Sequence, residues 1–305
     1  MSIWQCLHPP ENRILCRFFA NYPSSHLLKF LIIHRLHRFV SFLIFKGLIY
    51  SWFRVVNRLD LQGTQSCLGK QKSYRRQPFL IVGNHNASQD IIMHMAAWAH
   101  LNYFTFVFTT ETGFGTKHPF ETMVKHFLEM VPRHGTGESS VLRVVHRLRQ
   151  GDIIELAPTG NFPSGKWANT GFVAEGYSGA ARVAFTYWKQ VGRKLVIQPA
   201  CSLGANVAYP PQKRGKNSER ILNHKIIIKF GPPFTLDFSA NPDYHEFKAK
   251  SHEIDMRIAR IWGQKHIIPN LSRITHQQET GKGYPRVYDL DSPDSKTSWK
   301  IDDIT

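Results

Sequence analysis

The segment LIVGNHNASQDIIM, residues 80–93, passes from an apolar run through a polar turn into a second apolar run. The first run, PFLIVG at 78–83, predicts a buried strand because it is short, continuous and rich in branched side chains. The second run, at 90–101, predicts a helix, with Ser88 as its N-cap and Asp90 in its first turn. A strand that leads through a short loop into a helix is a repeating unit of α/β folds.

The same alternation continues along the chain. We expect further strands at 103–108, 130–133, 152–158, 195–203 and 224–231, and further helices at 117–128, 139–150, 176–190 and 244–265. The sequence therefore predicts an α/β domain over residues 61–268, with a central, mostly parallel sheet flanked by helices. Within it, the polar segment 60–77 is interpreted as a linker or loop. The polar tail, 269–305, is predicted to be mobile.

The first 60 residues are both basic and apolar. The whole chain has a net charge of +17, and residues 1–80 alone contribute +10. Cations interrupt two apolar stretches, 26–33 and 39–53, and Lys46 lies inside the longer one. A spanning helix needs about 20 mostly apolar residues. We therefore expect residues 1–60 to form amphipathic helices in a membrane interface, the alternatives being a hairpin packed on the domain and a true span.

The cysteines and the N-terminus indicate the compartment. The four cysteines are scattered, without the paired spacing of a zinc ribbon, which favours reduced thiols in a reducing compartment. The N-terminus lacks the pattern of a secretory signal peptide. Together with the basic surface, which attracts anionic lipids, these features predict a membrane-associated protein on the cytoplasmic face.

His85 and Asp90 are the candidate catalytic pair. His85 follows the predicted strand and Asp90 lies in the first helical turn, so one tight turn can bring the two side chains face to face. A carboxylate on one ring nitrogen of a histidine fixes its tautomer and leaves the other nitrogen as a base. Such a pair suits the deprotonation of an external hydroxyl or amine that attacks a thioester. The alternative is a capping aspartate beside an unrelated loop histidine.

The segment around this pair resembles the NHxxxxD motif of the glycerolipid acyltransferases, that is, the 1-acylglycerol-3-phosphate acyltransferases and their relatives. Asn84, His85 and Asp90 match the motif. In that family the histidine is the general base, the aspartate orients it, and the donor is acyl-CoA or acyl carrier protein. The resemblance implies that His85 and Asp90 are catalytic and that Asn84 helps to bind substrate. It also implies a thioester co-substrate and no bound cofactor.

Two segments downstream of this motif resemble the second and fourth motifs of the family, and they occur in the family's order. The strand at 130–133 ends in Arg133, where the family has an arginine that contacts the phosphate of the acceptor. The segment LVIQPACSL at 195–203 resembles the fourth motif, with Pro199 in the matching place. The resemblance covers residues 60–240 and implies a sheet flanked by helices, preceded by N-terminal helices that contact the membrane.

The segment PTGNFPSGK at 158–166 resembles the third motif but departs from it. Thr159 replaces the family's glutamate and Phe162 its arginine, and an alignment shifted along the same segment is the alternative. A loop rich in backbone amides can hold a tetrahedral oxyanion, and a nearby lysine can supply the missing positive charge. The substrate-binding residues predicted here are Thr159, Gly160, Asn161 and Lys166.

These features together predict a membrane-associated acyltransferase that moves an acyl chain from a thioester to a lipid hydroxyl, with a lysophospholipid as the favoured acceptor. Its expected partners are membrane lipids and the acyl-CoA or acyl carrier protein donor. Because the third motif has lost two charged residues, a neutral or amine lipid acceptor is one alternative. A lipid-binding scaffold that kept the fold without the chemistry is another.

Other classes of function fit the sequence less well. The pattern GxxxxGK at 160–166 is followed by Trp167, where a nucleotide-binding loop has a hydroxyl residue. His94 could join His85 and Asp90 as a metal ligand, but no carboxylate–histidine–histidine signature accompanies them, so no metal is expected. The positive charge could attract nucleic acid, but no nucleic-acid-binding motif supports that partner.

Overall fold

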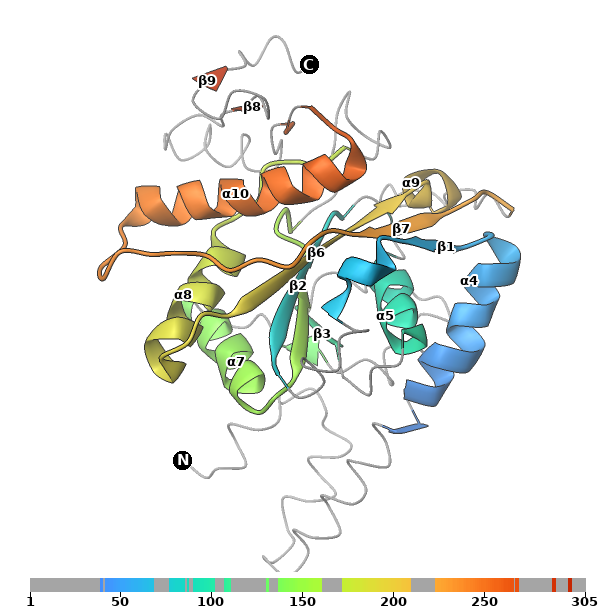
Figure 1. Cartoon of the computed structure of the whole chain (residues 1–305), viewed down its shortest axis with the longest axis horizontal. Helices are drawn as coiled ribbons and strands as arrows, with labels where there is room; N and C mark the ends of the chain where they lie inside the picture. The colour runs from blue at the N-terminus through green and yellow to red at the C-terminus, as the bar shows by residue number, and fades with distance from the viewer. Residues whose placement is uncertain are drawn as a thin grey trace, which may run out of the picture.

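A seven-stranded sheet, mostly parallel, forms the centre of the molecule (Figure 1). The computed structural model describes residues 39–40, 42–68, 77–85, 87, 90–101, 107–110, 130–131, 137–160, 172–209, 223–265, 267–268, 287–288 and 296–297. The strands of the sheet are β1 (Asp60–Gln62), β2 (Phe79–Gly83), β3 (Val107–Thr110), β4 (Met130–Val131), β5 (Ile153–Leu156), β6 (Val196–Leu203) and β7 (Ile227–Phe230). A separate antiparallel pair joins β8 (Val287–Tyr288) to β9 (Lys296–Thr297).

The strands lie in the order β1-β7-β6-β2-β5-β3-β4. β6 and β7 pair antiparallel, and the other neighbouring strands of this sheet pair parallel. β2 therefore lies between β5 and β6, with Ile81 opposite Glu155 on one side and opposite Gln198 on the other. The carboxyl ends of these three parallel strands meet at one edge of the sheet.

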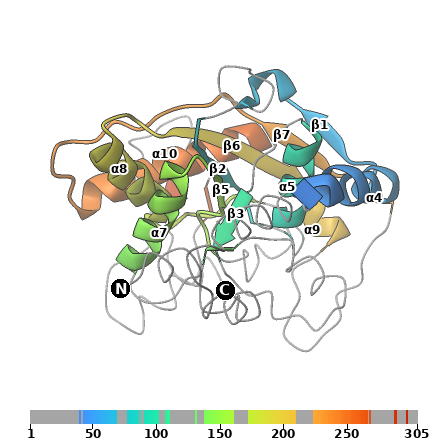
Figure 2. The ribbon, with the colours of Figure 1, turned by 90° about the horizontal axis from the view of Figure 1, so that it is seen from below.

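Helices cover both faces of the sheet. Their bounds are α4 (Tyr50–Val56), α5 (Asp90–His100), α7 (Gly137–Arg149), α8 (Gly179–Val191), α9 (Ala205–Ala208) and α10 (Tyr244–Trp262). Phe79 and Ile81 of β2 belong to the core shared with α4 and α5, whereas Leu80 and Val82 belong to the core shared with α7, α8 and α10. Figure 2 shows α7 beside α8 and, apart from them, α4 beside α5. β2 is buried along its whole length for this reason.

The predicted α/β architecture is confirmed, with differences in detail. The predicted strand at 103–108 is observed as Val107–Thr110, and the predicted helix at 117–128 lies outside the described residues. The prediction that 60–77 is only a linker or loop is wrong at its start. β1 pairs with β7, where Asp60 lies opposite Ile227, and residues 64–66 form a short 3-10 turn. An edge strand needs backbone pairing more than apolar side chains, so the polar composition of this segment conceals it.

A helix precedes the sheet and turns one side toward the domain. Residues 39–40 and 42–43 are helical, a π-helical turn, η2 (Ile44–Ile49), follows, and α4 completes the helix. Phe45, Ile49 and Phe53 are buried in the core that also contains α5. In the described part of the chain, no helix combines the length and the apolarity that crossing a bilayer requires. The apolar stretch at 26–33 lies outside the described residues.

The connection between α4 and β1 is short and buried. Asn57 is fully buried, and its side-chain oxygen accepts a hydrogen bond from the hydroxyl of Tyr209 at 2.5 Å. Its backbone oxygen accepts from the amide of Ile226 at 3.1 Å, and the amide of Leu59 donates to the carbonyl of Phe53. Asn57 therefore links the end of the helix to Tyr209, which follows α9, and to Ile226, which precedes β7.

Candidate active site

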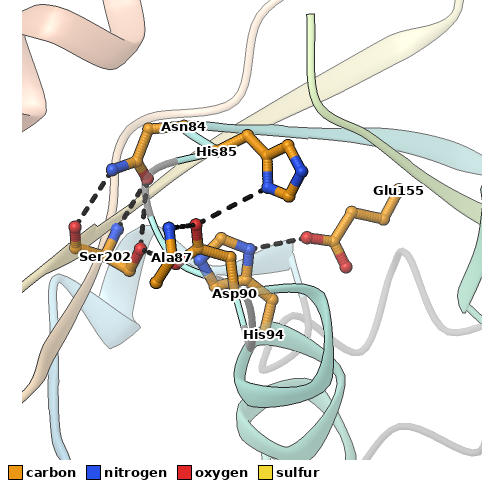
Figure 3. Close-up of polar contacts among 7 residues, drawn as sticks. All are labelled: Asn84, His85, Ala87, Asp90, His94, Glu155 and Ser202. Atoms are coloured by element: carbon orange, nitrogen blue, oxygen red, sulfur yellow. Dashed lines mark hydrogen bonds and ion pairs between the residues drawn. The ribbon is translucent and has the colours of Figure 1, made fainter. Parts of the chain in front are cut away.

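The turn after β2 places the predicted catalytic pair at the carboxyl edge of the sheet (Figure 3). β2 ends at Gly83, His85 follows two residues later, and α5 begins at Asp90. Nδ1 of His85 lies 3.7 Å from Oδ2 of Asp90. Asp90 is 1% exposed and His85 12%, so the histidine keeps access to solvent while the carboxylate does not. The two side chains face each other, as the spacing predicts, at the distance of an ion pair.

The carboxylate of Asp90 is held by hydrogen bonds on both oxygens. Oδ2 accepts from the backbone amide of Ala87 at 2.6 Å, and Oδ1 accepts from the hydroxyl of Ser202 at 2.6 Å. Through the bond to Ala87, Asp90 also caps the start of its helix, which is the role that the alternative interpretation of this residue gave it. The same oxygen, Oδ2, points toward His85. A carboxylate fixed in this way can orient a neighbouring imidazole ring.

Asn84 and Ser202 connect the turn to β6. The side chain of Asn84 donates to the carbonyl of Ser202 at 3.0 Å and accepts from its amide at 2.8 Å. The amide group of Asn84 thus extends the pairing of β2 with β6 beyond Gly83, which lies opposite Ala200. Asn84 is 3% exposed. In this structure its side chain supports the turn that contains His85.

Two buried ionisable groups lie beside this turn. Nδ1 of His94, on α5, lies 2.6 Å from Oε1 of Glu155, on β5. Burial opposes the charge on His94, but the charge and hydrogen bond of Glu155 outweigh it, so the pKa of His94 is raised. Burial raises the pKa of Glu155 against the opposing effect of His94.

Sequence reasoning misses three of these residues. Nothing in the sequence distinguishes Ser202 from other serines, and the sequence suggests His94 only as a possible metal ligand. Glu155 does carry a recognisable signal, because a carboxylate inside the apolar strand IIEL is rarely buried without a partner. Among the described residues, no group of three or more His, Cys, Asp or Glu side chains is placed to hold a metal ion.

The start of the third motif lies at the same edge of the sheet. Thr159 and Gly160 follow β5, which is paired in parallel with β2, so both turns leave the sheet in the same direction. Thr159 is 3% exposed, and Gly160 has a φ of 65°, a conformation that favours glycine. The amide of Gly160 donates to the carbonyl of Ala157 at 3.0 Å, which closes the turn.

A segment before α8 and a residue on α10 support this second turn. The amide of Tyr177 donates to the carbonyl of Pro158 at 2.8 Å, and the amide of Gly176 donates to Oδ2 of Asp255 at 2.7 Å. A Cβ at position 176 would lie 2.7 Å from Cβ of Pro158. This turn is therefore held by its backbone hydrogen bonds and by close packing against a segment that the side chain of Asp255 fixes.

The structure describes part of the predicted site. It brings Asn84, His85, Asp90, Thr159 and Gly160 to one edge of the sheet. The other predicted substrate-binding residues, Arg133, Asn161 and Lys166, lie outside the described residues, as does Phe162.

Comparisons with known proteins support the acyltransferase family and the fold. Residues 66–202 match the family model described as Acyltransferase. The chain is similar to the crystal structure of the 1-acyl-sn-glycerophosphate (LPA) acyltransferase PlsC from Thermotoga maritima. The TM-score is 0.52 at 14% sequence identity, over 75% of this chain and 81% of that chain. At this identity the likeness concerns the fold. A search of the curated proteins finds no match.

Proposed function

Residues 66–202 form a domain of the acyltransferase family, as the sequence resemblance predicted, and on this premise we propose that the protein acylates a lysophospholipid. The acyl chain comes from a thioester, and His85 is the general base. The observation that carries the proposal is the placement of Nδ1 of His85 at 3.7 Å from Oδ2 of Asp90, at the carboxyl edge of the sheet. Ligands of α/β sheets commonly bind at this edge.

The reaction needs one base and one oxyanion site. With Nδ1 of His85 directed to Asp90, Nε2 takes the proton of the acceptor hydroxyl. The oxygen attacks the thioester carbonyl, and the C–O bond forms as the carbonyl becomes a tetrahedral oxyanion. The intermediate collapses, the C–S bond breaks, and the leaving thiolate receives the proton from Nε2. The products are the acylated lipid and the free thiol of coenzyme A or of acyl carrier protein.

The predicted substrate-binding residues are given roles that fit this reaction. We assign the oxyanion to the amide-rich loop that contains Thr159, Gly160 and Asn161, because that turn leaves the sheet beside His85. Arg133 and Lys166 are proposed to bind the phosphate of the acceptor, since guanidinium and ammonium groups pair with phosphate oxygens.

A membrane-interface location fits the outer side of the N-terminal helix. Leu43, Leu48, Trp52 and Val55 are each about half exposed or more, at 48%, 64%, 52% and 76%. Leu43 and Leu48 are five residues apart, and the π-helical turn η2 begins directly after Leu43. Because a π-helical turn brings residues i and i+5 above one another, both leucines lie on the same side of the helix. The +10 charge of residues 1–80 adds attraction to anionic lipids. These features support a location on the cytoplasmic face of a membrane, where the acceptor lies.

The location can be tested on vesicles. Replacing Leu48 and Trp52 by glutamate should reduce cosedimentation of the protein with vesicles of phosphatidylglycerol and phosphatidylcholine by at least about tenfold, since two large apolar contacts are lost. Leu142, which is 46% exposed on α7, offers a control that should change nothing when replaced by glutamate. Equal binding by all three proteins would argue against this helix as the membrane contact.

The acyl transfer itself is tested with purified protein, palmitoyl-CoA and a panel of acceptors. The panel contains lysophosphatidic acid, other lysophospholipids, monoacylglycerol and an aminolipid, and products are identified by mass spectrometry. We expect an acylated lysophospholipid, and a loss of rate of about 100-fold or more in His85→Ala. Repeating the assay with palmitoyl-acyl carrier protein identifies the donor. Wild-type activity that His85→Ala leaves intact would refute the assignment of the base.

One observation favours a second acceptor class. Thr159 occupies the place of the family's glutamate, and Phe162 that of its arginine, so the third motif carries fewer charges than the resemblance implies. A neutral or amine lipid acceptor needs fewer charged contacts than a phosphate does. Product from monoacylglycerol or the aminolipid, and none from lysophosphatidic acid, would select this alternative. Absence of product with every donor and acceptor would favour a lipid-binding scaffold.

A further inference from the structure

The buried pair of His94 and Glu155 has no part in the reaction described above. Their side chains are 1% and 3% exposed, and 2.6 Å separates Nδ1 of His94 from Oε1 of Glu155. Figure 3 shows them next to the catalytic turn, with His94 one helical turn after Asp90. The charges that face the pair come from the same turn: Asp90 acts on both members, and His85 acts on Glu155.

His94 contacts both elements that carry the catalytic pair. It belongs to α5, whose first residue is Asp90, and residues four apart on a helix share one side. Its ring also lies against the end of β2, because a Cβ built on Gly83 would be 2.9 Å from Cε1 of His94. The hydrogen bond to Glu155 then fixes the ring to β5. One side chain thus sets the spacing between the strand that leads to His85 and the helix that begins at Asp90.

Stability alone does not account for a charged pair at this place. Buried ion pairs lose hydration, and replacing them by apolar residues of similar size is often neutral or stabilising. Moreover, Nε2 of His94 and Oε2 of Glu155 are buried without a hydrogen-bond partner among the described residues. Unpaired buried polar atoms are costly. An apolar core here would avoid both costs.

We propose that His94 and Glu155 are positioning residues, whose hydrogen bond ties α5 to β5 and holds Asp90 at its distance from His85. This inference rests on the proposed function, in which His85 is the base and Asp90 orients it. Catalytic groups lose much of their effect when displaced by about 1 Å, so a tie between the two elements is expected to act on the chemical step.

The test replaces the pair by apolar residues of similar size in the full-length protein, as His94→Leu with Glu155→Val. The inference predicts a folded protein whose kcat for acyl transfer falls by about 10- to 100-fold, with KM values for donor and acceptor within about twofold. Glu155→Gln should keep kcat within about threefold, because its amide oxygen still accepts a hydrogen bond from Nδ1 of His94. Ile254→Val, another buried change, on α10, is the control for a general disturbance of the core.

A second measurement is independent of activity. The amide of Ala87 donates to Asp90, so hydrogen exchange in a peptide that contains Ala87 reports the position of Asp90. The inference predicts faster exchange there in the double variant than in wild type or Ile254→Val, with exchange in β6 unchanged. This measurement decides the inference even if no wild-type acyl transfer is found, an outcome that would refute the proposed function alone.

Two outcomes would overturn the positioning role while leaving the proposed function intact. The first is a double variant with wild-type kcat and wild-type exchange at Ala87, which would mark the pair as a dispensable part of the core. The second is a loss of kcat in Glu155→Gln as large as in the double variant, which would assign the effect to charge and not to the hydrogen bond.

Discussion

The two turns at the carboxyl edge of the sheet are held in different ways. The turn after β2 is fixed by side chains: Asn84 and Asp90 both bond to Ser202. The turn after β5 is fixed by its backbone and by packing, through the bond from Tyr177 to Pro158 and the tight contact at Gly176. Side chains therefore hold the first turn directly, whereas Asp255 and Ser251 support the second turn only through the segment before α8.

The largest expected difference between the turns comes from matched aspartates. Asp90 and Asp255 are both 1% exposed, and each accepts a backbone hydrogen bond: Asp90 from Ala87 in the first turn, and Asp255 from Gly176 in the segment that packs against the second turn. Asp90→Asn should lower kcat by about 100- to 10,000-fold, because the amide no longer selects the tautomer that leaves Nε2 of His85 as a base. Asp255→Asn should lower kcat by less than about threefold where the protein is folded, because it acts only on turn geometry. Steady-state rates of both variants check this, and equal losses would remove the distinction.

A smaller effect is expected from matched serines. Ser202→Ala removes a hydrogen bond to Asp90 but keeps both backbone bonds to Asn84. We expect kcat to fall by about tenfold and the free energy of unfolding by about 1–2 kcal/mol. Ser251, buried on α10, donates to the carbonyl of Tyr177 at 3.3 Å and supports the second turn. Ser251→Ala should leave kcat within about twofold, and a tenfold loss there would show that both turns depend on side chains.

The smallest effect on activity is expected from a change of shape. Gly176→Ala places a Cβ 2.7 Å from Pro158 and 2.8 Å from a carboxylate oxygen of Asp255. The free energy of unfolding should fall by about 1–3 kcal/mol, while kcat of the folded protein changes by less than about threefold. Gly179→Ala is the control, because a Cβ added there would meet none of the described residues within 4 Å. Urea unfolding of both variants tests the pair, and unchanged stability of Gly176→Ala would contradict the packing account.

The sequence predicted those parts of the fold that depend on apolar pattern. The strand predicted at 78–83 and the helix predicted at 90–101 are observed as Phe79–Gly83 and Asp90–His100. They could be predicted because an element buried within the domain has a continuous run of apolar residues in its sequence. β1 was missed, because this edge strand consists of Asp60, Leu61 and Gln62 and has no apolar run in its sequence. The start of α8 was placed three residues early, since the extended segment before it is held by Pro158 and Asp255, which are distant in sequence.

The same distinction applies to the candidate site. Residues close in the sequence were predicted, and residues that only the sheet brings together were not. His85 and Asp90 were predicted because their spacing is local and the segment around them resembles the NHxxxxD motif, and the structure places the two side chains 3.7 Å apart. Ser202 is 112 residues from Asp90, and Glu155 is 61 residues from His94, so only the sheet order brings them to the turn. Residues recruited through strand pairing carry no local pattern that a single sequence reveals.

The buried connection at Asn57 has a mechanical consequence. With Asn57 bonded to Tyr209 and to Ile226, no freely rotating joint separates the N-terminal helix from the sheet. The orientation of the N-terminal helix relative to the sheet is therefore fixed by these hydrogen bonds and by the burial of Phe45, Ile49 and Phe53.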